Sequence, residues 1–374
     1  MIAAHSDPDQ AMHEGNPQQS RRLVFGASGY VGSNLVPYLV AAGVPVRAAA
    51  RSREVLSARP WEGVDTVQAD ALQPATLPPA LADIDTAYYL VHSMAAGKAF
   101  VALDLEAAAN FADAAAAAGV RRIVYLGGLL PEGAGGEHLD SRRATGETLR
   151  RGRVPVTELR AGIIIGPGSA AFEVMRDLTL NLPLMLTPRW VRAKSPPIAL
   201  DNLLEYLLRV PSLPETADEI LDAGGPEEVS YEDMMRMVAD VAGKRRPRII
   251  PVPVLTPRLS SYWLGLTTAV PGDIARALIG GLRHDFSADD SALRRLVPQP
   301  LLGVRAAIEA AFAAERRHTV AARWTEGAFA LRGFRHDVAF YAKRASGSAV
   351  ANAPPEALWQ AGLRVLGICC GQRV

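Results

Sequence analysis

Cysteines and aromatic side chains are scarce in this sequence of 374 residues, and neither sign of charge dominates it. The two cysteines, Cys369 and Cys370, are adjacent, which excludes a disulfide framework and the CxxC spacing of a metal site. The 40 Lys and Arg residues balance 39 Asp and Glu, so no overall field attracts nucleic acid or anionic lipid. We therefore expect a small-molecule partner and a reducing, cytoplasmic compartment.

Long hydrophobic runs are also missing. Residues 1–20 are rich in Asp, His, Gln and Pro, where a signal peptide needs an apolar core, and we interpret them as a disordered leader. Later apolar stretches are interrupted before they reach the roughly 18 residues of a membrane-spanning helix. Peripheral membrane contact through Tyr262 and Trp263 is an alternative to packing for the segment around them.

Short β-branched runs alternate with Ala-rich helical runs from Arg21 onward, the pattern of a parallel sheet with crossover helices. The predicted strands are residues 21–25, 44–50, 64–69, 86–93, 121–128 and 154–166. Right-handed crossovers give an α/β, Rossmann-type doubly wound sheet that binds ligands at the carboxyl ends of its strands. We place this unit at 21–253, a helical extension at 254–335, and a partial domain or irregular tail at 336–374.

The sharpest motif follows the first predicted strand and opens a helix. It consists of Gly26, Ala27, Ser28, Gly29, Tyr30, Val31 and Gly32. Gly26 suits a tight turn, Gly29 lets the backbone approach a pyrophosphate, and Gly32 allows close packing of helix against strand. A helix N-terminus after such a loop attracts phosphate, so this context favours a dinucleotide site over a simple tight turn.

The GxxGxxG spacing resembles that of the extended and atypical short-chain dehydrogenase/reductase (SDR) superfamily. Further landmarks in the same order are Asp70 in VQADALQP, VYLGG at 124–128, Glu147 in RRATGETL, LRAGIIIGPG at 159–168 and PIALDNL at 197–203. The resemblance spans residues 21 to about 253. It is strongest to the NAD(P)H-binding branch that includes NmrA-like redox sensors and an accessory subunit of respiratory complex I.

The resemblance also implies which residues meet the cofactor. The second strand ends in Ala49-Ala50-Arg51-Ser52-Arg53 without a carboxylate, and Arg51 stands where the family binds the 2′-phosphate, which favours NADP(H) over NAD(H). The alternative is that Arg51 and Arg53 are ordinary solvated charges. Asp70 and Ala71 would flank the adenine, and Val91, His92 and Ser93 would line the nicotinamide side of the crevice.

The catalytic set of the superfamily is missing. Members of the superfamily use a Tyr, a Lys four residues later and a Ser, but the matching positions hold Leu139, Arg143 and Gly127-Gly128. Arg143 could still reach a ribose or phosphate. His92 is a weak candidate for proton transfer, with a structural histidine as the alternative. We therefore expect an NAD(P)H-binding, oxidoreductase-like protein with an unknown acceptor, or a non-catalytic sensor or assembly factor. A sugar-nucleotide epimerase would need the missing Tyr.

Two other segments carry expectations. The run TPRWVRAKSPP, at 187–197, combines Trp190 with Arg189, Arg192 and Lys194, and either grips an anionic ligand or forms a loop over the sheet edge. Residues 341–367 resemble the opening strand and helix of an SRPBCC (START-like) domain. Such a domain needs more residues than follow, so we expect a truncated or frameshifted start, with a natural helical tail as the alternative.

Overall fold

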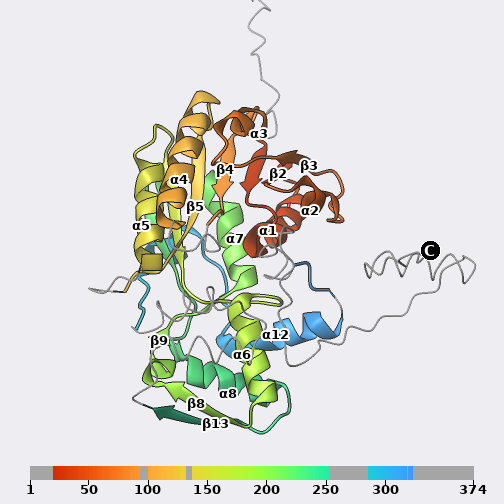
Figure 1. Ribbon diagram of the computed structural model, residues 1–374, viewed down its shortest axis with the longest axis vertical. Helices are drawn as coiled ribbons and strands as arrows, with labels where there is room; N and C mark the ends of the chain where they lie inside the picture. The colour runs from red at the N-terminus through yellow and green to blue at the C-terminus, as the bar shows by residue number, and fades with distance from the viewer. Residues whose placement is uncertain (1–19, 93–99, 132–136, 253–284, 318, 323–374) are drawn as a thin grey trace, which may run out of the picture. The chain divides into compact units, whose positions relative to one another are not determined.

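A seven-stranded, all-parallel sheet forms the centre of the N-terminal part of the protein in the computed structural model (Figure 1). Its order is β11-β6-β5-β4-β1-β2-β3. The strands are β1 (Arg22–Phe25), β2 (Val46–Ala50), β3 (Asp65–Gln68), β4 (Thr86–Tyr89), β5 (Arg122–Gly128), β6 (Val156–Ala161) and β11 (Ile220–Ala223). Strands β2 and β3 are added on one side of β1, and β4 and the strands after it are added on the other side. The strand order therefore reverses between β1 and β4. The predicted Rossmann-type α/β class is confirmed.

The structure describes residues 20–92, 100–131, 137–252, 285–317 and 319–322. All of them lie in the first of two units, Met1–Asp337 and Val338–Val374. The predicted leader, the SRPBCC-like tail, Ser93 and the segment around Trp263 lie outside the described residues. No described helix is long and apolar enough to cross a membrane.

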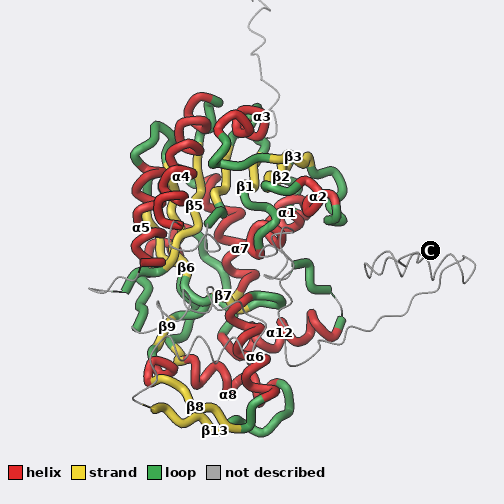
Figure 2. The backbone as a smooth tube through the Cα atoms, in the orientation of Figure 1, coloured by secondary structure: helices red, strands yellow, loops and turns green. Residues whose placement is uncertain are grey.

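Helices cover both faces of the sheet (Figure 2). The helices and 3₁₀ turns of this part are α1 (Tyr30–Ala41), α2 (Arg53–Ser57), η1 (Pro74–Thr76), α3 (Leu77–Leu81), α4 (Phe100–Ala117), α5 (Glu137–Arg150), α7 (Leu200–Arg209), η4 (Val210–Ser212) and η5 (Pro214–Thr216). Because successive strand residues point to opposite faces, Val24 packs with α1 and α7 while Phe25 packs with α3 and α4. On the second face the Phe111 ring lies 4.9 Å from the rings of both Phe25 and Tyr89, measured between centroids.

A buried arginine ties the first strand to the far end of α7. Arg22 donates from its guanidinium to the Tyr88 hydroxyl at 2.9 Å and to the Leu208 carbonyl at 2.7 Å. Burial raises the pKa of Tyr88 to about 12 although Arg22 acts against the shift. These bonds satisfy a charge that would otherwise be costly inside the core, so β1, β4 and α7 are held in one register.

A smaller lobe follows the sheet. It contains β7 (Ile164–Ile165), α6 (Ala170–Asn181), β8 (Leu184–Pro188), η3 (Arg189–Arg192), β9 (Lys194–Ser195), β10 (Ile198–Ala199), β12 (Val229–Ser230), α8 (Tyr231–Val241) and β13 (Arg248–Val252). Its strands form three two-stranded pairs, β10 with β7, β12 with β9 and β13 with β8. Phe172 and Met234 are fully or almost fully buried between α6 and α8, in a core of their own.

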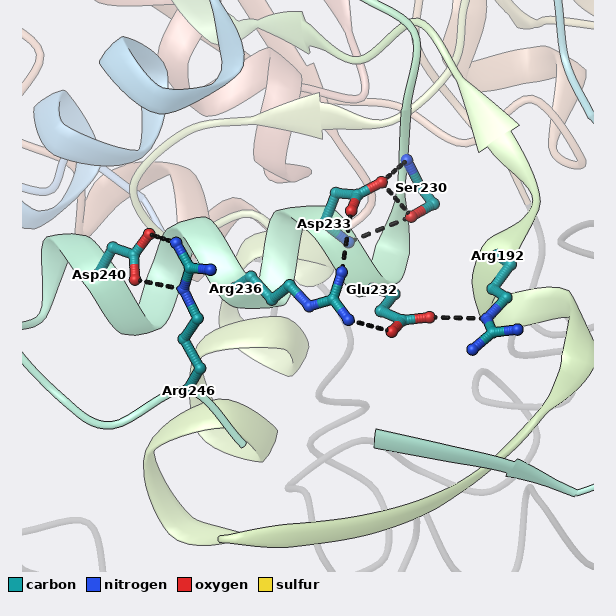
Figure 3. A network of polar contacts seen from close by, with 7 residues as sticks. All are labelled: Arg192, Ser230, Glu232, Asp233, Arg236, Asp240 and Arg246. Atoms are coloured by element: carbon teal, nitrogen blue, oxygen red, sulfur yellow. Dashed lines mark hydrogen bonds and ion pairs between the residues drawn. The ribbon is translucent and has the colours of Figure 1, made fainter. Parts of the chain in front are cut away.

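Helix α8 begins in a capping box and carries a polar network (Figure 3). The Ser230 hydroxyl accepts from the Asp233 N–H at 3.1 Å, which stabilises the first turn. The buried Glu232 accepts from Arg192 at 2.9 Å and from Arg236 at 2.5 Å. Arg192 is therefore bound to a structural carboxylate, which favours the structural reading of the TPRWVRAKSPP segment over an anion grip.

Two later helices complete the cores. Leu293 of α11 (Ser291–Leu296) joins the cluster beneath α1 and α7, and Ile308 of α12 (Val304–Arg316) joins the cluster of the smaller lobe. An ion pair between Arg176 of α6 and Glu315 of α12 adds a polar contact to that packing. The described residues after position 284 are thus integral to the unit that precedes them.

Two local predictions are wrong. The strand predicted at 154–166 is two strands, because β6 ends at Ala161 and β7 leaves the main sheet to pair with β10. The run of β-branched and apolar residues resumes at Ile163, directly after Gly162, and this resumption hides the break. The strand predicted at 86–93 ends at Tyr89, and the residues that follow border the site described below.

The packing of α12 generates the first prediction. Ile308→Ala should lower the free energy of unfolding by about 2–5 kcal/mol, because it removes a fully buried side chain. Glu309→Ala, at the neighbouring and exposed position, should change it by less than about 0.5 kcal/mol. Urea denaturation of the full chain measures both. Equal, small effects would show that α12 is not part of the core.

Candidate functional site

The glycine loop lies where the strand order reverses. Gly26 directly follows β1 and has a φ of +94°, a conformation that L side chains rarely adopt. A Cβ at Gly26 would stand 2.9 Å from the Leu90 carbonyl oxygen, at the end of β4. The N–H groups of Gly26 and Ala27 both donate to the Ala49 carbonyl at 3.0 Å, at the end of β2. The loop is therefore clamped between the ends of the two strands that flank β1.

The third glycine fixes helix α1 against the loop. A Cβ at Gly32 would lie 2.4 Å from the Gly26 carbonyl oxygen, closer than real Cβ contacts allow. The Ser33 hydroxyl donates to the Ala27 carbonyl at 2.8 Å. Gly29 is the N-cap and provides no side-chain hydrogen bond, and the first turn has no acidic residue. The first N–H groups of α1 thus suit an anion, and the helix dipole favours negative charge there.

Tyr30, within the same motif, connects the loop to the smaller lobe. Its hydroxyl donates to the Pro167 carbonyl at 3.1 Å. Burial and the charges of Asp201 and Glu173 raise the pKa of Tyr30. At neutral pH this phenol is therefore a fixed hydrogen-bond donor.

Arg51 lies at the end of β2, next to the glycine loop. Its side chain is exposed, and among the described residues it forms no ion pair. The Gln68 amide donates to the Arg51 carbonyl at 3.0 Å, and Ser52 caps α2 by accepting from Val55. The backbone at this position is therefore fixed while the guanidinium remains in solvent.

Asp70 and Ala71 follow β3, one strand further out. The Asp70 carboxylate accepts from the Leu72 N–H at 3.0 Å and so closes its own turn. Ala71 is buried, and its carbonyl accepts from Asn110 of α4 at 2.9 Å. The carboxyl edge of four adjacent strands therefore carries the glycine loop, Arg51, Asp70 and Val91.

His92 extends the end of β4 and belongs to a buried polar chain. Its Nδ1 lies 2.6 Å from Oδ2 of Asp104, which is on α4. The Ser141 hydroxyl of α5 donates to the same Asp104 oxygen at 3.1 Å. Burial lowers the pKa of His92, Asp104 opposes that shift, and the charge of Arg142 adds to it. The imidazole is therefore mainly neutral at neutral pH.

The structure places Arg142, not Arg143, beside the strand ends. Arg143 is exposed on α5. Arg142 is partly buried, and its Cδ would lie 3.3 Å from a Cβ at Gly128, the last residue of β5. The Nε of Arg142 is buried without a hydrogen-bond partner among the described residues. The sequence analysis named Arg143 because an alignment anchored on Glu147 places the family's Lys position at residue 143.

The missing catalytic residues are replaced by core packing. Leu139 is buried, and a Cβ at Gly127 would stand 3.0 Å from Oε1 of Glu158. Glu158 is itself buried and forms ion pairs with Arg150 and Arg160. The positions of the family's Tyr and Ser are thus filled by apolar and ion-pair contacts.

Tyr125 of β5 does not substitute for the missing Tyr. Its hydroxyl donates to the Arg142 carbonyl at 3.0 Å. Burial raises the pKa of Tyr125 to about 12, so it holds its proton at neutral pH. The sequence missed Asp104, Ser141 and Arg142, and only Asp104 gave a signal, as a carboxylate in the apolar periodicity of α4.

Comparison with known proteins agrees with this geometry. Residues 26–160 match a family described as NAD(P)H-binding. The crystal structure of Citrobacter sp. triphenylmethane reductase complexed with NADP(H) is similar, with a TM-score of 0.62, 20% identity, and coverage of 78% of this chain and 99% of the reductase. The structure of UDP-glucuronic acid 4-epimerase from Bacillus cereus, in complex with UDP-glucuronic acid and NAD, is also similar. Its TM-score is 0.61, its sequence identity is 16%, and the match covers 80% of this chain and 99% of the epimerase. No curated protein matches the chain.

These findings define the class of the domain. The reversal of strand order, the glycine loop at that point and the family match identify an NAD(P)H-binding Rossmann domain. The similar solved structures include one that contains NADP(H) and one that contains NAD. Residues 26–160 thus match an NAD(P)H-binding family and form the start of a Rossmann-type fold.

The close contact at Gly32 gives the second prediction. Gly32→Ala should abolish measurable NADPH and NADH binding, because its Cβ would displace the loop by its contact with the Gly26 carbonyl. Gly43→Ala is the control: its φ of +76° disfavours Ala, but nothing lies within 4 Å of its Cβ and the residue lies at the other end of α1. Gly43→Ala should lose about 1 kcal/mol of stability and keep nucleotide affinity. Calorimetric titration and urea denaturation separate the two effects, and unchanged affinity in Gly32→Ala would contradict the assignment.

Proposed function

We propose that the protein is an NADPH-dependent oxidoreductase that passes hydride to a small-molecule acceptor without the superfamily's Ser, Tyr and Lys. The observation that carries this proposal is the position of Arg51, an exposed cation beside the glycine loop that forms no ion pair within the described part of the chain. A 2′-phosphate is a dianion for most of the neutral range, and an arginine binds it with charge-assisted hydrogen bonds. A ribose without that phosphate offers Arg51 no such partner.

The cofactor would lie across the carboxyl edge of the sheet. The first turn of α1 would hold the pyrophosphate, Asp70 and Ala71 would border the adenine, and Val91 and His92 would border the nicotinamide. When bound, the nicotinamide supplies a hydride. The chain supplies the anion-binding loop and walls that exclude water.

A catalytically silent NADPH sensor or assembly factor is the second candidate function. The observation in its favour is the replacement of the catalytic positions by Leu139 and by the Glu158 ion pairs. The NmrA-like branch, which the sequence resembles, includes sensors of that kind. In contrast, an SRPBCC-like ligand domain at 341–367 would favour an enzyme with an apolar acceptor.

Arg51 generates the third prediction. Arg51→Asp should weaken NADPH binding by one to two orders of magnitude, because an attraction to the 2′-phosphate becomes a repulsion, and NADH affinity should change little. Arg53→Asp, two residues away on the exposed start of α2, is the matched control. The difference between its effects on NADPH affinity and on NADH affinity should be much smaller. Calorimetry with both nucleotides measures the effects. Equal losses for NADPH and NADH in Arg51→Asp would refute its role.

The fourth prediction separates the two candidate functions. The wild-type protein should oxidise NADPH in the presence of at least one probe from a panel of menadione, 9,10-phenanthrenequinone and a cationic triphenylmethane dye. The fall in nicotinamide absorbance measures turnover. Tight NADPH binding without turnover of any probe would favour the sensor. Absence of binding would contradict both candidates.

A further inference from the structure

We propose that His92 is the proton donor and Arg142 the anchor for the acceptor oxygen in this site, which makes a carbonyl compound the class of acceptor. The inference rests on the proposed function. It deepens that function by assigning the proton transfer for which the superfamily's residues are missing.

The position of His92 is the first support. Leu90 and Val91 touch the space that a Gly26 side chain would fill, so the segment after β4 forms the wall of the loop that holds the cofactor. His92 is the next residue. An imidazole at the end of β4 therefore lies on the nicotinamide side of the strand reversal, where a proton donor must stand.

The position of Arg142 is the second and independent support. Its side chain lies over Gly128, at the end of β5, the strand next to β4. The Nε–H group is buried without an acceptor among the described residues, a state that costs free energy unless a partner arrives. A ligand oxygen is the partner that fits, and the guanidinium would stabilise negative charge that develops on it.

Asp104 acts as a positioning residue. It binds Nδ1 of His92 at 2.6 Å and is held in turn by Ser141, so the ring has one orientation and Nε2 is the nitrogen that exchanges the proton. The charged groups that face His92 among the described residues are Asp104 from α4 and Arg142 from α5. Asp104 stabilises the imidazolium and Arg142 opposes it.

The reaction is balanced in electrons and protons. Bound NADPH would supply a hydride, so that a C–H bond of the cofactor would break with its electron pair and a new C–H bond would form at the carbonyl carbon of the acceptor. The π pair of the carbonyl moves to its oxygen, which takes the Nε2 proton of the His92 imidazolium. His92 then takes up a proton from bulk solvent, so the sum of the reaction would be NADPH, carbonyl and one proton to NADP⁺ and alcohol.

The test exploits an acceptor that needs no proton. A triphenylmethane dye cation becomes neutral on accepting hydride alone, whereas the carbonyl of phenanthrenequinone needs hydride and a proton. His92→Gln should lower kcat for phenanthrenequinone about 10²-fold more than it lowers kcat for the dye, and calorimetry measures any accompanying change in NADPH affinity. Arg142→Gln should raise KM for the quinone about tenfold, while Arg151→Gln, an exposed control just beyond α5, should change nothing.

The pH profile tests Asp104. Reduction of the quinone requires the imidazolium, so its rate should fall as pH rises through the pKa of His92, which burial places below its ordinary value of 6.5. Asp104→Asn keeps the side chain's shape and removes the charge that favours the imidazolium. The fall of the quinone-reduction rate should therefore occur at lower pH in Asp104→Asn than in the wild type. The rate of dye reduction should be independent of pH in both proteins.

Several outcomes would overturn the proposal. Equal losses of quinone and dye reduction in His92→Gln would show a structural role for His92, and urea denaturation would reveal the accompanying loss of stability. If the fall of the quinone-reduction rate with rising pH occurred at the same pH in Asp104→Asn as in the wild type, the positioning role of Asp104 would be contradicted. Wild-type reduction of the dye without any carbonyl would refute this assignment and leave the oxidoreductase intact. NADPH binding without turnover would contradict the oxidoreductase itself.

Discussion

The contact between the glycine loop and the end of β4 is the constraint on which the site depends. The Gly26 backbone fills a gap too small for a Cβ, between Leu90 on one side and the start of α1 on the other. Because the loop cannot move outward, the N-terminus of α1 stands directly over the reversal of strand order. The same contact fixes the segment that carries His92. The same contact therefore positions both the helix N-terminus that suits an anion and the polar chain from His92 through Asp104.

The sequence predicted the sheet and the glycine loop because both are encoded locally. β-branched runs separated by Ala-rich helices specify parallel strands, and the spacing of Gly26, Gly29 and Gly32 specifies a close turn. The break between β6 and β7 was not predicted, since residues typical of strands lie on both sides of Gly162. It depends on pairing with β10, some 35 residues further along.

The side chains around His92 show where prediction from sequence ends. Arg142 and Arg143 are adjacent and chemically equal, so only the rotation of α5 against the sheet decides which one meets Gly128. Asp104 was recoverable in principle, because Ala108, Phe111 and Ala115 place it on the buried face of α4, and a carboxylate there needs a partner. The partner of Asp104 lies on another element. Hydrophobic periodicity indicates that a residue is buried, but it does not show which residue of another element it contacts.

The packing of α11 has a consequence for synthesis on the ribosome. Val24 and Leu293 belong to the same hydrophobic cluster, although some 270 residues separate them along the chain. A nascent chain that has already formed β1 and α1 must therefore hold an incomplete apolar face until translation has passed α11. Contacts this distant slow folding and prolong exposure of that face. Early occupation of the glycine loop by a nucleotide would stabilise the first strands during this interval by mass action.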